Sequence, residues 1–197
     1  MGKRLNIKVK MMSRRKFFIN LILIFVLLPL HGSMSNAKDA YRKYLDLAIK
    51  FQKQRRFKEA EMVFSKGITE YPSVAILYFK RAELRKDYMG GCQRAIPDYT
   101  MAIKLKKIPK AYYKRGLCMT KQGLYHIAVR DFNNCLKIRP NYGGRVYFAR
   151  AEAYAKLNMV KEALRDLKLT VKHDPKYRKA VESFRRKLLM GTSFWER

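Results

Sequence analysis

The sequence is poor in the residues that build small cross-linked or fibrous folds. It has three cysteines among 197 residues, too few and odd in number for a disulfide-stapled miniprotein. Ten glycines and six prolines exclude a collagen-like or low-complexity chain. Acidic residues are scarce as well: 15 Asp and Glu stand against 45 Lys and Arg, so the formal charge is +30 at pH 7. A chain this basic is expected to attract acidic partners.

What the sequence does contain is enough apolar material for a packed core. Hydrophobic residues make up 48% of the chain and aromatic residues 13%, a composition that excludes wholesale disorder. A length of 197 residues allows one domain, or one domain with an appendage.

The first 37 residues have the pattern of a secretory signal peptide. They contain seven basic residues and no acidic one, followed by an apolar run from Phe17 to Leu30. That run has 14 residues, short of the ~20 that a membrane-spanning helix needs. Ser35 and Ala37 have the spacing that a signal peptidase reads. We therefore expect a signal over residues 1–37 and a mature chain from Lys38, whose formal charge falls from +30 to +23 with the loss of those seven residues.

Two further interpretations of this segment stay open. Residues 17–30 could remain as a membrane anchor, because shorter segments can span a bilayer by thinning it. Residues 13–18 also resemble the twin-arginine export motif, whereas the Leu- and Ile-rich apolar run is typical of the general secretory route. Each interpretation takes the protein out of the cytoplasm, as a periplasmic, secreted or membrane-anchored protein.

The rest of the chain repeats itself with a period of about 34 residues. Small residues recur in register, a large apolar residue follows each of them by four positions, and an aromatic residue stands at the fourth position of each repeat. The repeated small residues are Ala60, Ala95, Ala128 and Ala163, spaced 35, 33 and 35 apart; the apolar residues after them are Phe64, Tyr99, Phe132 and Leu167; the aromatic residues are Tyr44, Tyr78, Tyr112 and Tyr147.

This grid resembles the tetratricopeptide-repeat (TPR) family over about residues 41–177. The resemblance implies an all-α fold, an α-solenoid of four helix-turn-helix repeats at residues 41–74, 75–108, 109–142 and 144–177. Small residues let the two helices of a repeat approach closely, and a proline after the second helix ends it. A capping helix is expected at residues 178–190, ended by Gly191 and followed by a tail at residues 191–197.

One departure from the family pattern recurs in the last three repeats. The seventh position carries arginine and the twenty-third carries aspartate, whereas the first repeat has Leu47 and Val63 there. Because the two charges appear together and disappear together, we expect structural ion pairs, within one repeat or between neighbours; two independent surface charges are the alternative. The residues are Arg81, Asp98, Arg115, Asp131, Arg150 and Asp166.

Residues with catalytic or metal-binding chemistry are few. The three histidines are scattered, and no cluster of His, Cys, Asp and Glu has metal-ligand spacing. Cys118 and Cys135 are expected to be buried thiols. Cys92, in an expected loop, is a candidate for a reactive thiol or for pairing outside the chain. The sequence therefore predicts no enzyme, no cofactor, no metal and no small-molecule substrate, and it leaves the oligomeric state open.

The family resemblance implies a binding surface instead. In such stacks the first helix of each repeat lines a concave face. At the corresponding positions of this chain basic and aromatic residues interleave, which suits an extended acidic or carboxy-terminal peptide. The candidates are Arg42, Lys53, Phe79, Lys80, Lys86, Lys110, Tyr113, Lys114, Lys121, Arg145, Phe148 and Lys156.

We therefore expect a non-catalytic protein–protein interaction scaffold, in which Lys110, Lys114 and Arg145 are best placed to meet one anionic group. Lys110 and Lys114 resemble part of the carboxylate clamp of chaperone-binding TPR proteins. That clamp also needs asparagines, and Leu45 and Ile49 stand in the first repeat instead, so no chaperone assignment follows.

Two alternatives compete with a peptide groove. The first is a merely solvated face, since lysines near helix C-termini are favoured by the helix dipole. The second is electrostatic binding of an envelope polyanion: an anionic lipid, a cell-wall polymer or a nucleic acid.

Overall fold

The structure, a computed structural model, describes residues 34–195. From residue 41 onward the described residues form one compact unit. The expected signal segment lies outside the described residues, apart from residues 34–37 at the start of the first helix. The described elements are α2 (Met34–Lys53), α3 (Phe57–Glu70), α4 (Ala75–Tyr88), α5 (Gly91–Leu105), α6 (Pro109–Lys121), α7 (Tyr125–Ile138), η1 (Pro140–Tyr142), α8 (Gly144–Lys156), α9 (Val160–His173), η2 (Pro175–Tyr177) and α10 (Arg178–Trp195).

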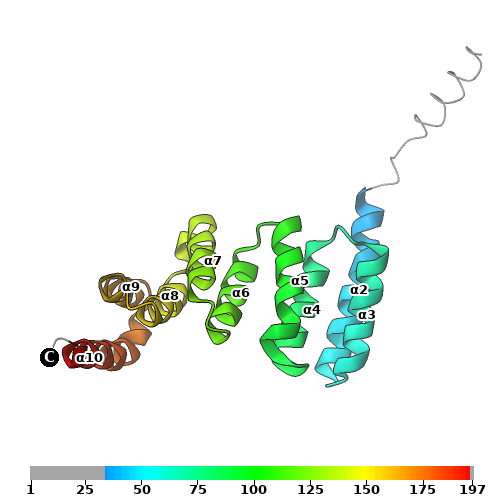
Figure 1. The fold of residues 1–197 in the computed structure, drawn as a ribbon. Coiled ribbons are helices and arrows are strands. Elements are labelled where there is room, and N and C mark those ends of the chain that lie inside the picture. Colours follow the sequence, from blue (N-terminus) through cyan, green and yellow to red (C-terminus); the bar gives the residue numbers. More distant parts are fainter. Residues whose placement is uncertain (1–33, 196–197) are drawn as a thin grey trace, which may run out of the picture. The chain divides into compact units, whose positions relative to one another are not determined.

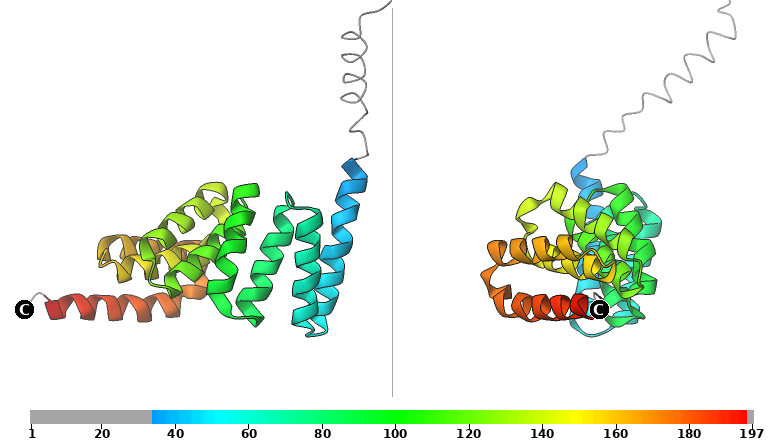
Figure 2. Two further views of the ribbon diagram at one scale, coloured as in Figure 1. Left: turned by 45° about the vertical axis from the view of Figure 1, so that its right-hand side comes forward. Right: turned by 60° about the vertical axis from the view of Figure 1, so that its left-hand side comes forward.

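From Tyr41 onward the helices form consecutive pairs, stacked side by side in the order of the sequence (Figures 1 and 2). The pairs are α2 with α3, α4 with α5, α6 with α7, and α8 with α9, and short turns join the members of each pair. From α4 onward, each first helix also packs on the second helix of the pair before it. This arrangement confirms the expected all-α solenoid of helical repeats.

The repeated small residues lie where the two helices of a pair meet. Ala60, Ala95, Ala128 and Ala163 are fully buried, and so are the large residues that follow them by four positions, except for a trace of exposure at Leu167. At Gly116 the helices α6 and α7 approach equally closely, since a Cβ there would lie 2.7 Å from Cε1 of Phe132. Only the smallest side chains therefore fit at these positions, because neighbouring aromatic rings fill the remaining space.

The cysteines differ from the sequence prediction. Cys118 forms a disulfide with Cys92, with a Cα–Cα distance of 5.0 Å, so it is not a free thiol. Cys92 lies in the first turn of α5 rather than in a loop, because Gly90, at φ +102°, closes a two-residue turn that lets α5 begin at Gly91. The disulfide links the second and third repeats. Cys135 is a free, buried thiol as expected, and burial raises its pKa to about 11.

The last helix is longer than the sequence suggested. It was expected to end at Met190, with a tail at residues 191–197, but α10 continues through Gly191 to Trp195. A glycine costs about 1 kcal/mol relative to alanine inside a helix. It ends a helix only where it leaves the right-handed conformation, as in a C-terminal cap, and here the helical backbone continues past it.

Candidate functional site

Three arginines on the first helices each hold a carboxylate on the second helix of the same pair. In every case Nε and Nη2 donate to the two carboxylate oxygens, the two-pronged geometry that gives arginine–carboxylate pairs their specificity. The aspartates are almost completely buried. The pairs and their N–O distances are Arg81–Asp98 (2.8 and 2.8 Å), Arg115–Asp131 (2.8 and 2.7 Å) and Arg150–Asp166 (2.7 and 2.8 Å).

The same arginines also reach back to the preceding repeat. Nη1 of each donates to a polar side chain that lies five residues after the repeat alanine. The acceptors are Ser65 for Arg81 (2.9 Å), Thr100 for Arg115 (3.0 Å) and Asn133 for Arg150 (2.5 Å). We call each set of arginine, aspartate and preceding polar acceptor a junction network. The sequence left open whether the pairing lies within a repeat or between neighbours. The junction network contains contacts of both kinds.

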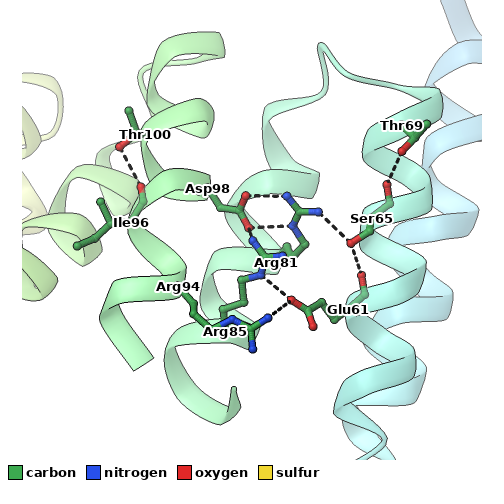
Figure 3. A network of polar contacts seen from close by, with 9 residues as sticks. All are labelled: Glu61, Ser65, Thr69, Arg81, Arg85, Arg94, Ile96, Asp98 and Thr100. Carbon is green, nitrogen blue, oxygen red and sulfur yellow. Dashed lines mark hydrogen bonds and ion pairs between the residues drawn. The ribbon is translucent and has the colours of Figure 1, made fainter. Parts of the chain in front are cut away.

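The polar acceptors could have been recognised from the sequence. Ser65, Thr100 and Asn133 occupy one register position, and the fourth repeat has Lys168 there. The hydroxyl of Ser65 donates to the Glu61 carbonyl and that of Thr100 to the Ile96 carbonyl, which leaves their oxygens free to accept from arginine. Figure 3 shows Ser65 accepting from Arg81 in this way.

The first junction network is larger than the others. Arg85 donates to Glu61 (2.7 Å) and to Asp98 (2.9 Å), and Arg94 approaches Glu61 at 3.4 Å (Figure 3). At the next junction the hydrogen bonds to Asp131 raise the pKa of Arg115 above its usual value. These arginines are scaffold residues, since their donors are already engaged within the stack.

We call the surface made by the candidate binding positions of α2, α4, α6 and α8 the first-helix face. The aromatic candidates on it contribute mainly to packing. Phe79 is only 3% exposed and lies against Tyr99, so little of its ring is open to a partner. Half-buried Tyr113 contacts Phe132 and Tyr142.

Phe148 is the third aromatic candidate and is also half-buried, against Tyr177 and Phe184. Phe79, Tyr113 and Phe148 share one position of the repeat. At that position the ring is covered by neighbouring helices, because each first helix is enclosed by the elements that follow it.

Several cations of the first-helix face are paired. Lys80 and Lys110 both bind the carboxylate of Glu83, each at 3.0 Å, and Lys86 pairs with Asp87. Lys110 also lies 5.5 Å from the ring centroid of Phe79. Because Glu83 binds both ammonium groups, Lys80 and Lys110 are less available to a partner than their positions in the repeat predicted.

Lys114 is different from its neighbours. It is half-buried and forms no hydrogen bond or ion pair with any residue in the described part of the chain. Burial lowers the pKa of its ammonium group and repulsion from Lys86 and Lys110 also lowers it, whereas attraction from Glu83 and Asp87 raises it. A carboxylate brought to Lys114 would offset both effects.

The remaining candidates lie on the surface. Lys121 and Lys156 are exposed in the last turns of α6 and α8. Arg145 is exposed at the start of α8, 6.0 Å from the ring centroid of Tyr142, and Arg42 is exposed on α2. Within residues 34–195, no group of three His, Cys, Asp or Glu side chains is placed to hold a metal ion. No helix in that range combines the length and the apolar character needed to cross a membrane.

Comparison with known families agrees with the repeat grid. The model of the tetratricopeptide repeat matches residues 109–142, which contain α6, α7 and the turn between them and coincide with the third repeat of the sequence analysis. The third helix pair therefore matches a tetratricopeptide repeat. The other helix pairs share the spacing of small and large residues found in that repeat.

Solved structures with the same fold include several TPR-like MamA proteins. The MamA RS-1 ArsTM double mutant has a TM-score of 0.66 at 15% identity and covers 79% of this chain and 92% of that one. MamA 41-end from Desulfovibrio magneticus RS-1 has a TM-score of 0.65 at 17% identity, covering 80% and 96%. At such identities the likeness shows the fold alone.

Curated relatives include serine/threonine-protein phosphatase 5. The protein from Rattus norvegicus is 32% identical over 116 residues, and that from Homo sapiens is 31% identical over the same length. The match covers 57% of this chain but only 22% of the relative, so the chain spans about a fifth of the length of these relatives. The similarity concerns the TPR region and carries no catalytic activity over. TPR folds are typically non-catalytic scaffolds for protein–protein interaction.

Proposed function

We propose that this TPR protein is exported and binds an acidic segment of a protein partner on the first-helix face of its second and third repeats. The observation that carries the proposal is Lys114, a half-buried ammonium group with two cations near it and no partner among the described residues. A partly desolvated charge interacts with a carboxylate more strongly than an exposed one, because salt and water screen it less.

The arrangement of charge around Lys114 favours a peptide over a uniform polyanion. Glu83 and Asp87 lie on the same face as Lys80, Lys86 and Lys110. These carboxylates repel a polymer with closely spaced negative charges but tolerate a segment whose carboxylates are spaced apart. The high net charge of +30 supports the second candidate, a polyanion held by a diffuse field.

Two observations support export. The pattern over residues 1–37 is that of a signal peptide. The disulfide between Cys92 and Cys118 suits an oxidising compartment, since disulfides are rare in the cytosol. The intact mass of the exported protein tests this part of the proposal. A start at Lys38 is expected, and a full-length chain in the membrane fraction would favour an anchor at residues 17–30.

The binding proposal is tested with a short labelled peptide of alternating leucine and aspartate, titrated against the protein at physiological salt. Lys114→Gln is expected to weaken binding at least about tenfold, or ~1.4 kcal/mol. The matched control is Lys161→Gln, which removes the same charge from an exposed site on α9 and should change affinity by less than about twofold.

Salt dependence separates the two candidate functions. If the protein binds a polyanion instead, Lys114→Gln and Lys161→Gln should lower the affinity equally, and the affinity should fall steeply as the salt concentration rises. Equal losses would therefore contradict the peptide site. Thermal melting of each variant checks that neither change unfolds the stack.

A further inference from the structure

A hollow of about 640 Å³ lies between α9 and α10. Its floor is made of aliphatic side chains from both helices, and four cations surround it: Lys168 and Lys172 on α9, and Arg178 and Arg185 on α10. One acidic residue, Glu182, lines it as well. None of the four cations forms an ion pair with a residue that the structure describes. Charge of one sign is thus gathered around an apolar surface.

The sequence explains where this hollow lies in the repeat scheme. α10 repeats part of α8 at a distance of 35 residues. Val181 corresponds to Val146, and both are buried, at 7% and 0% exposure. Arg185 corresponds to Arg150, and Lys168 on α9 corresponds to Asn133 on α7. The hollow is therefore the fourth place in the stack where an arginine of the junction-network position meets the preceding second helix.

The fourth place lacks the partners that the other three have. Arg150 lies between the Asn133 side chain on one side and the Asp166 carboxylate on the other. Arg185 instead shares its hollow with Lys168, another cation. No described residue supplies a carboxylate in the way that Asp166 does for Arg150, and α10 packs on α9 less extensively than α8 packs on α7.

We propose that the hollow between α9 and α10 is a docking site for an acidic amphipathic helix of a protein partner, which places a carboxylate between Lys168 and Arg185. This site is separate from the first-helix face. The lining residues of α9 span 164–172 and those of α10 span 178–185, at helical spacing. Two turns of helix measure about 11 Å, so the hollow suits a helix that presents side chains at i, i+3, i+4 and i+7.

The positive charge around the hollow indicates which kind of partner can bind there. A second copy of this chain brings its own excess of positive charge, which the four cations would repel. Arg186 stands where α8 has Ala151, so at that position α10 lacks the small residue that lets α9 approach α8 closely. The partner helix is therefore expected to lie over the hollow, with its carboxylates toward the cations and its apolar stripe toward the aliphatic floor.

The test uses the full chain and a synthetic, hydrocarbon-stapled helical peptide with a leucine stripe, flanking glutamates and one aspartate at the edge of the stripe. Arg185→Gln is expected to weaken binding at least about tenfold. Lys187→Gln is the matched control. It lies two residues further along α10, about 200° around the helix, outside the lining of the hollow, and should change affinity by less than about twofold.

Changing the peptide aspartate to asparagine gives a second measurement that leaves the protein untouched. This change should weaken binding to the native chain about tenfold and have little further effect on Arg185→Gln, because the pair is already broken. Lys114→Gln should leave this affinity unchanged, which distinguishes the two proposed sites.

Four results would overturn the proposal. They are an equal loss from Lys187→Gln; a loss from Lys114→Gln that matches the loss from Arg185→Gln; Arg185-dependent binding of phosphatidylglycerol vesicles without peptide binding; and self-association of the chain that Arg185→Gln abolishes.

Discussion

The first repeat and the three that follow it are held together differently. The later repeats carry Arg81, Arg115 and Arg150, whose side chains are 15–17% exposed. Each of these arginines binds an aspartate of its own repeat and a polar side chain of the preceding repeat. The first repeat has Leu47 at this position, 43% exposed. In the later repeats the polar acceptor comes from the second helix of the preceding repeat, and no helix before α2 is among the described residues. Each junction network therefore combines an ion pair within one repeat with a hydrogen bond between repeats.

The comparison also shows what the ion pairs contribute. Buried ion pairs are costly to break but often neutral to replace with apolar residues of similar volume. The first repeat contains such a replacement, Leu47 with Val63, inside the same chain. The two residues of each pair are thus expected to be strongly coupled to each other. The pairs are expected to contribute less to the net free energy of folding than their number suggests.

Breaking one pair should have the largest effect. Arg115→Leu leaves the carboxylate of Asp131, which is 1% exposed, without its counter-charge, and should lower the free energy of unfolding by about 3–5 kcal/mol. Urea denaturation measures the change. The double variant Arg115→Leu with Asp131→Val copies the first repeat and should recover much of the loss. Additive losses in the double variant would show that the two residues do not act as a pair.

Removing the disulfide should have the next largest effect. Cys92 and Cys118 are 26 residues apart and join the second repeat to the third, a link that the junction between the third and fourth repeats lacks. Cys92→Ser with Cys118→Ser should lower stability by about 3 kcal/mol, the entropy of closing a loop of this size in the unfolded chain. Denaturation with and without reductant measures it. Reductant should destabilise the native chain and leave the double variant unchanged; an equal effect on both would contradict the expectation.

Removing one polar acceptor should have the smallest effect. Thr100→Val deletes the oxygen that accepts from Arg115 across the repeat junction, and should cost about 1 kcal/mol. Thr69→Val is the matched control, because the Thr69 hydroxyl bonds only within its own helix, to the Ser65 carbonyl, and should cost less than about 0.5 kcal/mol. Equal costs in thermal melting would mean that the link to the preceding repeat adds nothing.

Much of the fold could be predicted because its signal is periodic and local. The spacing of Ala60, Ala95, Ala128 and Ala163 follows from the contact of two helices in each repeat. The ion pairs were indicated because arginine and aspartate occur together in the last three repeats and are both missing from the first, as in the pair of Arg115 and Asp131. The continuation of α10 past Gly191 was missed because a lone glycine weakens a helix without ending it.

The candidate site was harder to predict, because availability depends on contacts. The sequence marked Lys110 and Lys114 alike, one helical turn apart on α6. Only their surroundings separate them: Lys110 pairs with Glu83 of the preceding repeat, while Lys114 does not. Phe79 was marked as a partner-binding ring, and the packing of Tyr99 against it makes it part of the core.

The sequence by itself determined the repeat period, the all-α architecture and the excess of positive charge, because these depend on residue type and on spacing along one helix. The tertiary structure alone decided that Cys92 bonds to Cys118, that Lys80 and Lys110 both pair with Glu83, and that Arg185 and Lys168 line the same hollow. These outcomes depend on how the faces of neighbouring helices are turned toward one another, which is set by the packing of side chains that are distant in the sequence.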